Sequence, residues 1–203
     1  MEPRDLTFTE IVNITDDRFL PWLDLYETAF PPAERVLVST FIHLLKEKST
    51  GEALDQHLLA GLDAQKNLAG MAAYELNPEA GLAFLWYLAI APNLRSQGIG
   101  SFFYQEIVRR VDLAKYPLLL YEVEIPEGED SATALRRIQF YQRNGAQILS
   151  GIYYMQHVGW HQPPIPMHLM VHLRKPLEPQ QVFDLAKIAF QDHLQQTSDL
   201  KLV

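Results

Sequence analysis

The segment LAIAPNLRSQGIGSFFYQEIVRRV, residues 88–111, constrains the fold more than any other part of the sequence. The apolar run 82–90 predicts a strand that is covered on both faces. From Gly98 onward, apolar residues recur every three or four positions, which predicts a helix with one buried face. Between the two lie Arg95, Gly98 and Gly100. The segment therefore predicts a strand, a glycine turn and a helix in that order.

A glycine turn at the start of a helix is suited to binding an anion. The first helical turn has N–H groups without intrahelical acceptors, and glycine lets an anion approach without meeting a Cβ atom. Arg95 adds a positive charge. A tight turn that only packs a helix onto a sheet is the alternative. The sequence lacks the lysine of a Walker loop, and Phe103 and Tyr104 stand where a dinucleotide fingerprint needs its third glycine.

The rest of the sequence predicts an α+β fold in a single domain, residues 1–203, without internal repeats or linkers. The helix predicted for 177–196 is an addition to the core. The expected strands are residues 7–14, 57–64, 67–77, 82–90, 116–126, 146–157 and 165–173, and the expected helices are residues 16–30, 31–48, 98–114, 131–145 and 177–196.

Composition limits the class of partner. The formal net charge is −8, and no basic run appears, so a nucleic-acid partner is not expected and a neutral or cationic small molecule is favoured. No apolar run reaches the roughly 20 residues that span a bilayer, and the N-terminus lacks the pattern of a signal peptide. We therefore expect a cytoplasmic protein that does not bind membranes.

The chain has no cysteine, which excludes disulfides, thiolate metal sites and a cysteine nucleophile. Two histidine pairs are spaced four residues apart, His157 with His161 and His168 with His172. In a strand such residues lie roughly 13 Å apart. No metal site is expected.

Two segments resemble the GNAT superfamily of acetyl-CoA-dependent N-acetyltransferases. LAIAPNLRSQGIGSFFYQEIV is similar to its acyl-CoA signature, Arg/Gln-x-x-Gly-x-Gly/Ala, and IQFYQRNGAQIL, residues 138–149, is similar to its later Leu/Phe-Tyr-x-x-x-Gly helix. The order of elements from residue 7 to 173 also matches. The resemblance implies a mixed, largely antiparallel sheet of about seven strands flanked by helices.

The resemblance further implies that the turn holds the CoA pyrophosphate and that the end of the preceding strand pairs with the pantetheine arm. The implied cofactor-binding residues are Leu88, Ala89, Ile90, Arg95, Ser96, Gln97, Gly98, Ile99, Gly100 and Ser101. Many members carry an asparagine seven residues before the motif tyrosine, where this chain has Ala134. Arg136 and Arg137 either compensate by reaching a phosphate or form a solvated helix face.

Acetyl transfer to an amine needs a base and an acid. The resemblance implies that Tyr141 protonates the departing CoA thiolate, with a core aromatic as the alternative. For the base we expect Glu122 or Glu124, which share one face of a strand and are expensive to bury unless they are paired or functional. Instead of acting as a base, these two carboxylates could pair with Arg136 or Arg137, or be exposed at the end of the strand. Weaker acceptor-side candidates are Glu75 and Glu34.

The sequence thus predicts an N-acetyltransferase that moves an acetyl group from acetyl-CoA directly to the amine of a small molecule in a ternary complex. The alternatives are an acyl-CoA-binding module without turnover and a protein N-acetyltransferase. The final helix either covers a sheet edge or builds a homodimer. Aromatic residues that either line an acceptor pocket or belong to the core are Trp86, Tyr87, Trp160 and those in 152–155.

Overall fold

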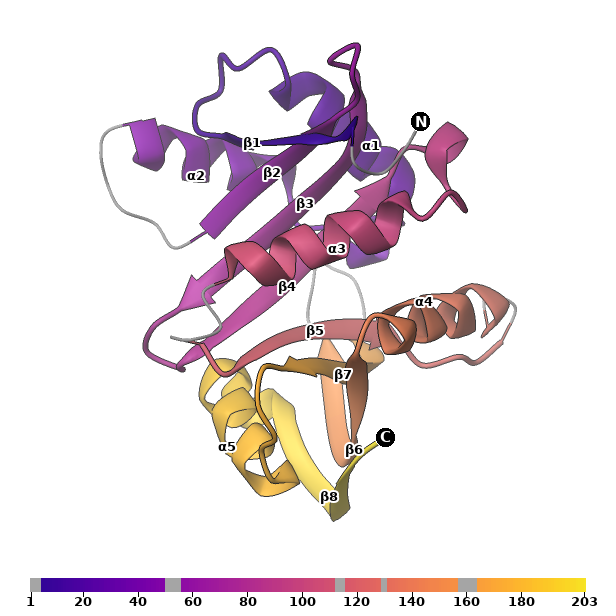
Figure 1. Ribbon diagram of the computed structural model, residues 1–203. Helices are drawn as coiled ribbons and strands as arrows, with labels where there is room; N and C mark the ends of the chain where they lie inside the picture. Colours follow the sequence, from indigo (N-terminus) through magenta and orange to yellow (C-terminus); the bar gives the residue numbers. More distant parts are fainter. Residues whose placement is uncertain (1–4, 50–55, 112–115, 129–130, 157–163) are drawn as a thin grey trace. The chain divides into compact units, whose positions relative to one another are not determined.

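The structure is a computed structural model, and it describes residues 5–49, 56–111, 116–128, 131–156 and 164–203. Its helices lie between groups of strands along the chain (Figure 1). The elements are β1 (Thr7–Ile11), α1 (Phe19–Ala29), η2 (Pro32–Glu34), α2 (Val38–Ser49), β2 (Gln56–Leu62), β3 (Leu68–Asn77), β4 (Leu82–Ile90), η3 (Pro92–Leu94), α3 (Ile99–Arg110), β5 (Leu118–Glu124), α4 (Ser131–Arg143), β6 (Ala146–Gln156), β7 (Ile165–Leu173), α5 (Pro179–Phe190), η4 (Gln191–His193) and β8 (Leu194–Leu202).

The strands follow the order β1-β2-β3-β4-β5-β7-β6-β8 in the sheet. The pairing of β4 with β5 is parallel, and the pairs β1–β2, β2–β3, β5–β7, β6–β7 and β6–β8 are antiparallel. The mixed, largely antiparallel sheet with flanking helices confirms the expected fold class.

Two compact units make up the described chain. Unit 1 contains the residues up to Glu75 and Trp86–Ile107, and unit 2 contains Leu76–Leu85 and the residues from Val108 onward. Strands β3 and β4 contribute residues to both units. Single-domain organisation stays a prediction.

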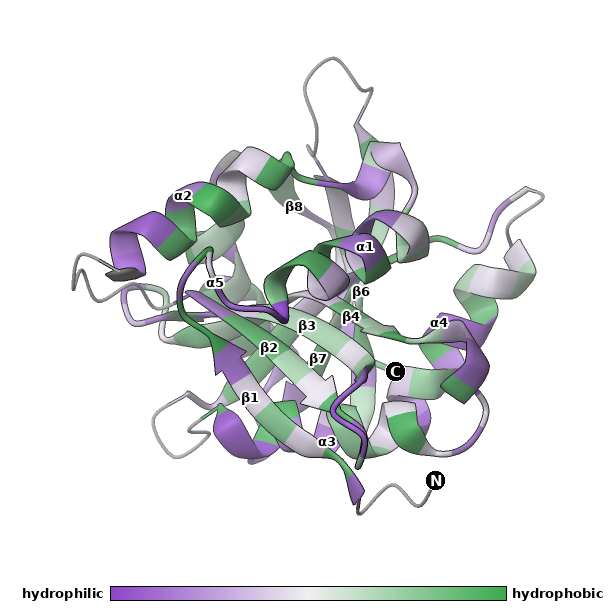
Figure 2. Ribbon diagram, turned by 90° about the horizontal axis from the view of Figure 1, so that it is seen from above, coloured by the Kyte–Doolittle hydropathy of each residue, from purple (hydrophilic) through white to green (hydrophobic). Residues whose placement is uncertain are grey.

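Unit 1 has helices on both faces of its strands. Figure 2 shows α1 and α2 on one side of β2 and β3 and α3 on the other. The core under α1 and α2 contains the fully buried Trp22, Tyr26 and Phe41. On the α3 side, an added Cβ atom at Gly61 or Gly70 would lie 2.6 or 2.9 Å from the Phe103 ring. These two glycines therefore let α3 pack closely on the strands.

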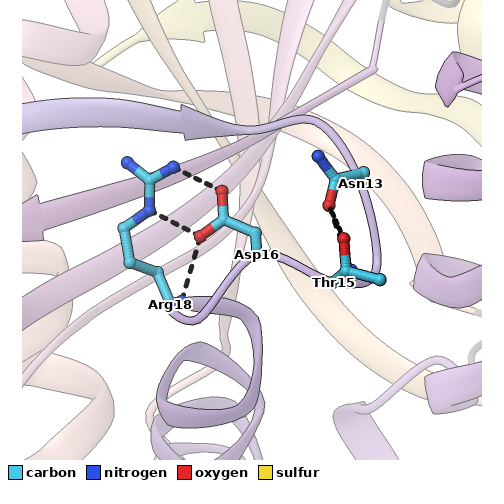
Figure 3. Close-up of polar contacts among 4 residues, drawn as sticks. All are labelled: Asn13, Thr15, Asp16 and Arg18. Atoms are coloured by element: carbon cyan, nitrogen blue, oxygen red, sulfur yellow. Dashed lines mark hydrogen bonds and ion pairs between the residues drawn. The ribbon is translucent and has the colours of Figure 1, made fainter.

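The turn between β1 and α1 is closed by side chains (Figure 3). Asn13 Oδ1 accepts hydrogen bonds from the Thr15 backbone N–H at 3.0 Å and the Thr15 hydroxyl at 2.8 Å. Asp16 accepts from the backbone N–H and the guanidinium of Arg18. The Arg18 guanidinium lowers the pKa of Asp16, so this carboxylate stays ionised and fixes the approach to α1.

The segment 31–37 differs from the helix that the sequence predicts from residue 31. Only Pro32–Glu34 form a 3₁₀ turn, Arg35 is extended with φ −100° and ψ 134°, and the α-helix begins at Val38. Tertiary hydrogen bonds explain the difference, because tyrosine hydroxyls bond the backbone groups of Glu34 and Val36.

In unit 2, the C-terminal segment differs from the prediction. The helix expected over 177–196 begins as predicted, with Pro179 in its first turn and a capping box between Glu178 and Gln181, but it ends at Phe190. Gln191 has a φ of 48°, which a helix cannot continue. Leu194–Leu202 then forms β8, an eighth strand that pairs with β6.

The core of unit 2 lies between its strands and α5. Leu118, Leu120 and Leu169 are fully buried there with Val182 and Ala186 of α5. Among the described residues, no helix combines the length and the apolar content that crossing a membrane requires.

Candidate active site

The glycine turn lies in unit 1, between β4 and α3, as the sequence predicts. The strand ends at Ile90, η3 covers Pro92–Leu94, and α3 begins at Ile99. The segment from Arg95 to Gly98 is exposed, whereas Ile99 is fully buried. The helix is therefore anchored by its first residue while the turn before it faces solvent.

The backbone of this turn is shaped for donating hydrogen bonds outward. Ser96 and Gly98 have φ values of 61° and 79°, in the left-handed region that glycine tolerates best. The Phe102 N–H donates to the Gly98 carbonyl at 3.1 Å. Helix geometry then leaves the N–H groups of Gly98, Ile99 and Gly100 without acceptors inside the helix.

Two side chains fix the turn from within. Arg95 Nε donates to the Ile90 carbonyl at 3.0 Å, and Gln97 Nε2 donates to the Asn93 carbonyl at 3.0 Å. The first bond holds the guanidinium beside the end of β4. An exposed cation and a helix N-terminus next to each other are suited to binding an anion such as a phosphate.

The strand that precedes the turn presents Leu88, Ala89 and Ile90. Ala89 is buried under α1 and α2, while Ile90 packs with Ile99 at the start of α3. The parallel register of β4 with β5 pairs Ala83 with Leu119 and Phe84 with Leu120, in the first half of β4. Main-chain pairing of 88–90 with a pantetheine arm stays a prediction.

Glu122 is held by two side chains of β6 in unit 2. The Tyr154 hydroxyl donates to one carboxylate oxygen, and Gln156 Nε2 donates to the other. Burial raises the pKa of Glu122, although these two hydrogen bonds oppose the rise. Gln156 Oε1 is buried and has no hydrogen-bond partner among the described residues. Glu122 is thus a buried carboxyl group that takes up a proton more readily than an exposed one.

Glu124, two residues further along β5, has a different partner. The Arg137 guanidinium of α4 donates to Glu124 Oε1, and Glu124 Oε2 is buried with no hydrogen-bond partner in the described part of the chain. The pairing that the sequence left open as an alternative is therefore present for Glu124. Contact of Arg137 with a phosphate stays a prediction. Its neighbour Arg136 donates to the Thr133 hydroxyl at 3.1 Å on the exposed side of α4.

Tyr141 lies in the same unit, on α4, with 7% of its surface exposed. Its ring packs against Tyr121 of β5 at a centroid distance of 4.3 Å. Burial raises the pKa of Tyr141 to about 12, with Arg137 opposing and Glu124 adding to the rise. The phenol therefore keeps its proton at neutral pH, as a general acid must. Ala134, about two turns earlier on the same face of α4, is also buried.

The weaker acceptor-side candidates, Glu34 and Glu75, both lie in unit 1. Glu34 is half-buried in η2, and Glu75 Oε2 accepts from Gln56 Nε2 at 3.4 Å. Burial lowers the pKa of His168 and of His172 on β7. His157, His161 and Trp160 lie outside the described residues, and the described part of the chain contains no group of three or more potential metal ligands.

Sequence reasoning missed Tyr154 and Gln156 as partners of Glu122. The two residues have the spacing of one strand face, and 152–155 was noted only for its aromatic character. Their contact with β5 depends on the strand order β5-β7-β6, which no local pattern reveals. It also missed the hydroxyl of Tyr87, which bonds the segment between α1 and α2.

The fold is shared with solved structures of other proteins. A comparison with curated protein sequences gives no match. The structure resembles a protein assigned to the GNAT family from Bacteroides thetaiotaomicron, with a TM-score of 0.67, 23% identity and coverage of 92% of this chain and 98% of that one. It also resembles spermidine N-acetyltransferase from Vibrio cholerae, solved with CoA and spermine, with a TM-score of 0.62, 16% identity and coverage of 84% and 96%. At these identities the likeness concerns the fold.

The family itself is given by the sequence. The family model described as "Acetyltransferase (GNAT) family" matches residues 19–146, which is more than half of the chain and includes the glycine turn and Tyr141. The chain therefore belongs to the GNAT family of acetyltransferases.

Proposed function

We propose that the protein transfers an acetyl group from acetyl-CoA directly to the amine of a small molecule. The observation that carries this proposal is the exposed turn before α3, where backbone N–H groups, a left-handed Gly98 and the Arg95 guanidinium face outward together. In this proposal the pyrophosphate binds at Arg95–Ser101, and Leu88–Ile90 pair with the pantetheine arm. Bound acetyl-CoA would supply an activated thioester.

The reaction needs a neutral amine. An alkylamine with a pKa near 10.4 is almost entirely protonated at pH 7, with roughly one molecule in a few thousand neutral. A base whose own pKa lies closer to neutrality removes that proton most effectively. Burial raises the pKa of Glu122, whereas Glu124 is already neutralised by Arg137. We therefore assign the base to Glu122, directly or through water.

The departing sulfur needs a proton. Tyr141 is buried and protonated at neutral pH, so it can donate. In the proposed reaction, the C–N bond forms as the C–S bond breaks. Glu122 takes the proton that the ammonium form of the amine loses, and Tyr141 gives its proton to the departing sulfur. The second proton, which the nitrogen loses as the amide forms, restores the Tyr141 phenol, so one proton remains on Glu122 and passes to solvent. Because the chain has no cysteine, a covalent acetyl-cysteine step is not available.

For the acceptor we propose a small, cationic amine. The net charge of −8 favours cationic ligands over anionic ones. A protein of similar fold from Vibrio cholerae acts on spermidine, as its name states, which makes polyamines the first class to test. Glu34 and Glu75 are the acceptor-side carboxylates that the proposal includes.

CoA release measured over a panel of polyamines, amino acids and aminoglycosides tests the proposal. We expect turnover with at least one amine and a clear rise in melting temperature with CoA. A protein that binds CoA but releases no CoA from acetyl-CoA with any amine would instead be a binding module. Ala134, which stands where many family members have an asparagine, favours that alternative.

Tyr141→Phe tests the acid. We expect its kcat to fall about 100-fold with an unchanged Kd for CoA. Tyr116→Phe is the matched control, because it removes the hydroxyl of another buried tyrosine of unit 2, 2% exposed. An unchanged kcat in Tyr141→Phe would reject the assignment.

A further inference from the structure

Two contacts join α4 to β5, and both involve the surroundings of the proposed acid. The Tyr141 ring packs against Tyr121 at a centroid distance of 4.3 Å. The Arg137 guanidinium, which lies four residues before Tyr141 on the helix, donates to Glu124 Oε1 on the strand. Together the ring contact and the ion pair hold one register between α4 and β5. The Tyr141 hydroxyl therefore has a defined position.

The ion pair also brings a positive charge close to the phenol. Residues four apart on a helix are neighbours, with about 5–6 Å between their Cβ atoms, and long side chains lean toward the N-terminus of the helix. The Tyr141 ring therefore lies over the turn that carries Arg137. The side chain of Arg137 is 31% exposed and that of Glu124 is 21% exposed, so water screens their charges only in part.

The two charges act on the phenol in opposite directions. Burial raises the pKa of Tyr141 to about 12, Arg137 opposes the rise, and Glu124 adds to it. When Tyr141 gives its proton to the sulfur, a phenolate forms at a buried position. A guanidinium one turn away stabilises that phenolate more than it stabilises the neutral phenol.

We propose that Arg137 is the positioning residue of the acid: held by Glu124, its guanidinium fixes Tyr141 against β5 and stabilises the phenolate that forms as the phenol protonates the departing sulfur. The inference rests on the proposed function, because it takes Tyr141 as the acid. It also assigns the Arg137 guanidinium to Glu124 instead of to a phosphate of CoA. Loss of the guanidinium should therefore slow the chemical step and leave CoA binding unchanged.

A double-mutant cycle of Arg137→Met and Tyr141→Phe tests whether Arg137 acts through Tyr141. We expect Arg137→Met to lower kcat about tenfold and to leave the Kd for CoA and the acceptor KM within about twofold. In the Tyr141→Phe background, the same substitution should change kcat by less than about twofold, because no phenolate forms there. Arg137→Lys keeps the charge and should recover most of the lost kcat.

Arg143→Met is the matched control. It removes the same charge from an exposed position in the last turn of α4. We expect its kcat to stay within about twofold of the wild type, because an exposed charge is screened by water. Circular dichroism and the melting temperature show whether each variant is folded.

A titration of the tyrosine absorbance measures the effect without any substrate. The absorbance of each protein minus that of its Tyr141→Phe counterpart, recorded in stopped-flow pH jumps into alkali, gives the pKa of Tyr141. Arg137→Met removes the charge that lowers this pKa and should raise it, whereas Glu124→Gln removes the charge that raises it and should lower it. A variant that only loosened α4 would expose the phenol and lower the pKa in both cases.

The outcomes separate this inference from the proposed function. An Arg137→Met variant that keeps its kcat, loses kcat equally in both backgrounds, binds CoA more weakly or shows no rise in the Tyr141 pKa overturns the inference alone. An unchanged kcat in Tyr141→Phe, or a wild type without turnover on any amine, overturns the proposed function, and this inference with it.

Discussion

The two units of the molecule present their polar groups in different ways. In unit 1 the turn from Arg95 to Gly98 is exposed, and its hydrogen-bond donors belong to the backbone. In unit 2 the polar groups are half-buried side chains on the strands, with Glu122 bonded by Tyr154 and Gln156. The backbone donors of the turn depend on the positions of the glycines in the sequence. The side-chain cluster around Glu122 depends on which strands are neighbours in the sheet.

This difference predicts how each region responds to substitution. The turn of unit 1 is exposed from Arg95 to Gly98, so changes there should alter binding and spare the fold. The Glu122 cluster of unit 2 borders the core through Tyr154, so changes there should alter stability as well as chemistry.

The largest expected effect is that of Gly100→Leu in unit 1. A side chain in the first turn of α3 occupies the space that a phosphate needs, so the Kd for CoA should rise at least about 100-fold, or about 2.7 kcal/mol. Calorimetric titration with CoA measures it. Gln105→Leu, at an exposed position of the same helix, should leave the Kd unchanged. Tight CoA binding by a folded Gly100→Leu protein would show that the CoA phosphates do not bind at this turn.

Glu122→Gln should lower the acetylation rate about 100-fold. The substitution also tests the pKa. Burial raises the pKa of Glu122 above 4.5, so the folded state holds this proton more tightly than the unfolded state does. The stability that results is present at low pH and is lost as the pH rises through the folded pKa.

The free energy of unfolding of the wild type should therefore fall relative to Glu122→Gln between pH 5 and pH 8. Urea titrations of both proteins at pH 5 and at pH 8 measure this difference in the free energy of unfolding. Glu127→Gln, at an exposed position after β5, should follow the wild type in rate and in pH dependence. A constant difference between wild type and Glu122→Gln would show that Glu122 does not titrate in this range.

Tyr154→Phe should lower the free energy of unfolding by about 1–3 kcal/mol, because it leaves a buried carboxylate without one of its donors. Tyr153→Phe on the same strand should change it by less than about 0.5 kcal/mol, since Tyr153 is 50% exposed and Tyr154 is 6% exposed. Equal effects, read by urea denaturation at pH 7, would contradict the role of Tyr154.

Unit 1 has a weaker counterpart to this cluster. Glu10 Oε1 accepts from Lys48 Nζ at 2.7 Å and from His57 Nδ1 at 2.9 Å. Burial acts to raise the pKa of Glu10, but the bonds from His57 and Lys48 outweigh it and lower the pKa to about 2. The stabilisation is complete above pH 4.5 and is lost as the pH falls from 4.5 toward 2.

Glu10→Gln should therefore cost about 1 kcal/mol at pH 7 and progressively less in acid. Urea midpoints at pH 7 and pH 4 measure the change, and Asp24→Asn at an exposed position of α1 is the control. If the loss of stability in Glu10→Gln is as large at pH 4 as at pH 7, the loss results from packing and not from the charge of Glu10.

Local sequence patterns predicted the parts of the molecule that local forces determine. The strand, turn and α3 lie where the apolar run, the glycines and the helical periodicity place them. The predicted end of α4 is confirmed, because the N–H groups of Asn144 and Gly145 close the last turn onto Tyr141 and Gln142.

Tertiary contacts decided the segments that the sequence predicted wrongly. Residues 31–37 have the prolines of a helix start, but tyrosines from α1 and β4 bond their backbone in an extended form. Residues 194–202 lack the apolar periodicity of a strand, yet β6 pairs with them. The partners of Glu122 were likewise hidden, because β7 separates β5 from β6 in the sheet order.

The pairing of β6 with β8 has a consequence for solubility. Gly151 has a φ of 82°, and a Cβ atom there would lie 2.5 Å from the Asp199 carbonyl oxygen of β8. Any larger residue at 151 would push the last strand away from its neighbour. The uncovered edge of β6 would then offer unpaired peptide groups to another molecule, so a substitution far from Glu122 and Tyr141 in the sequence would show itself first as aggregation.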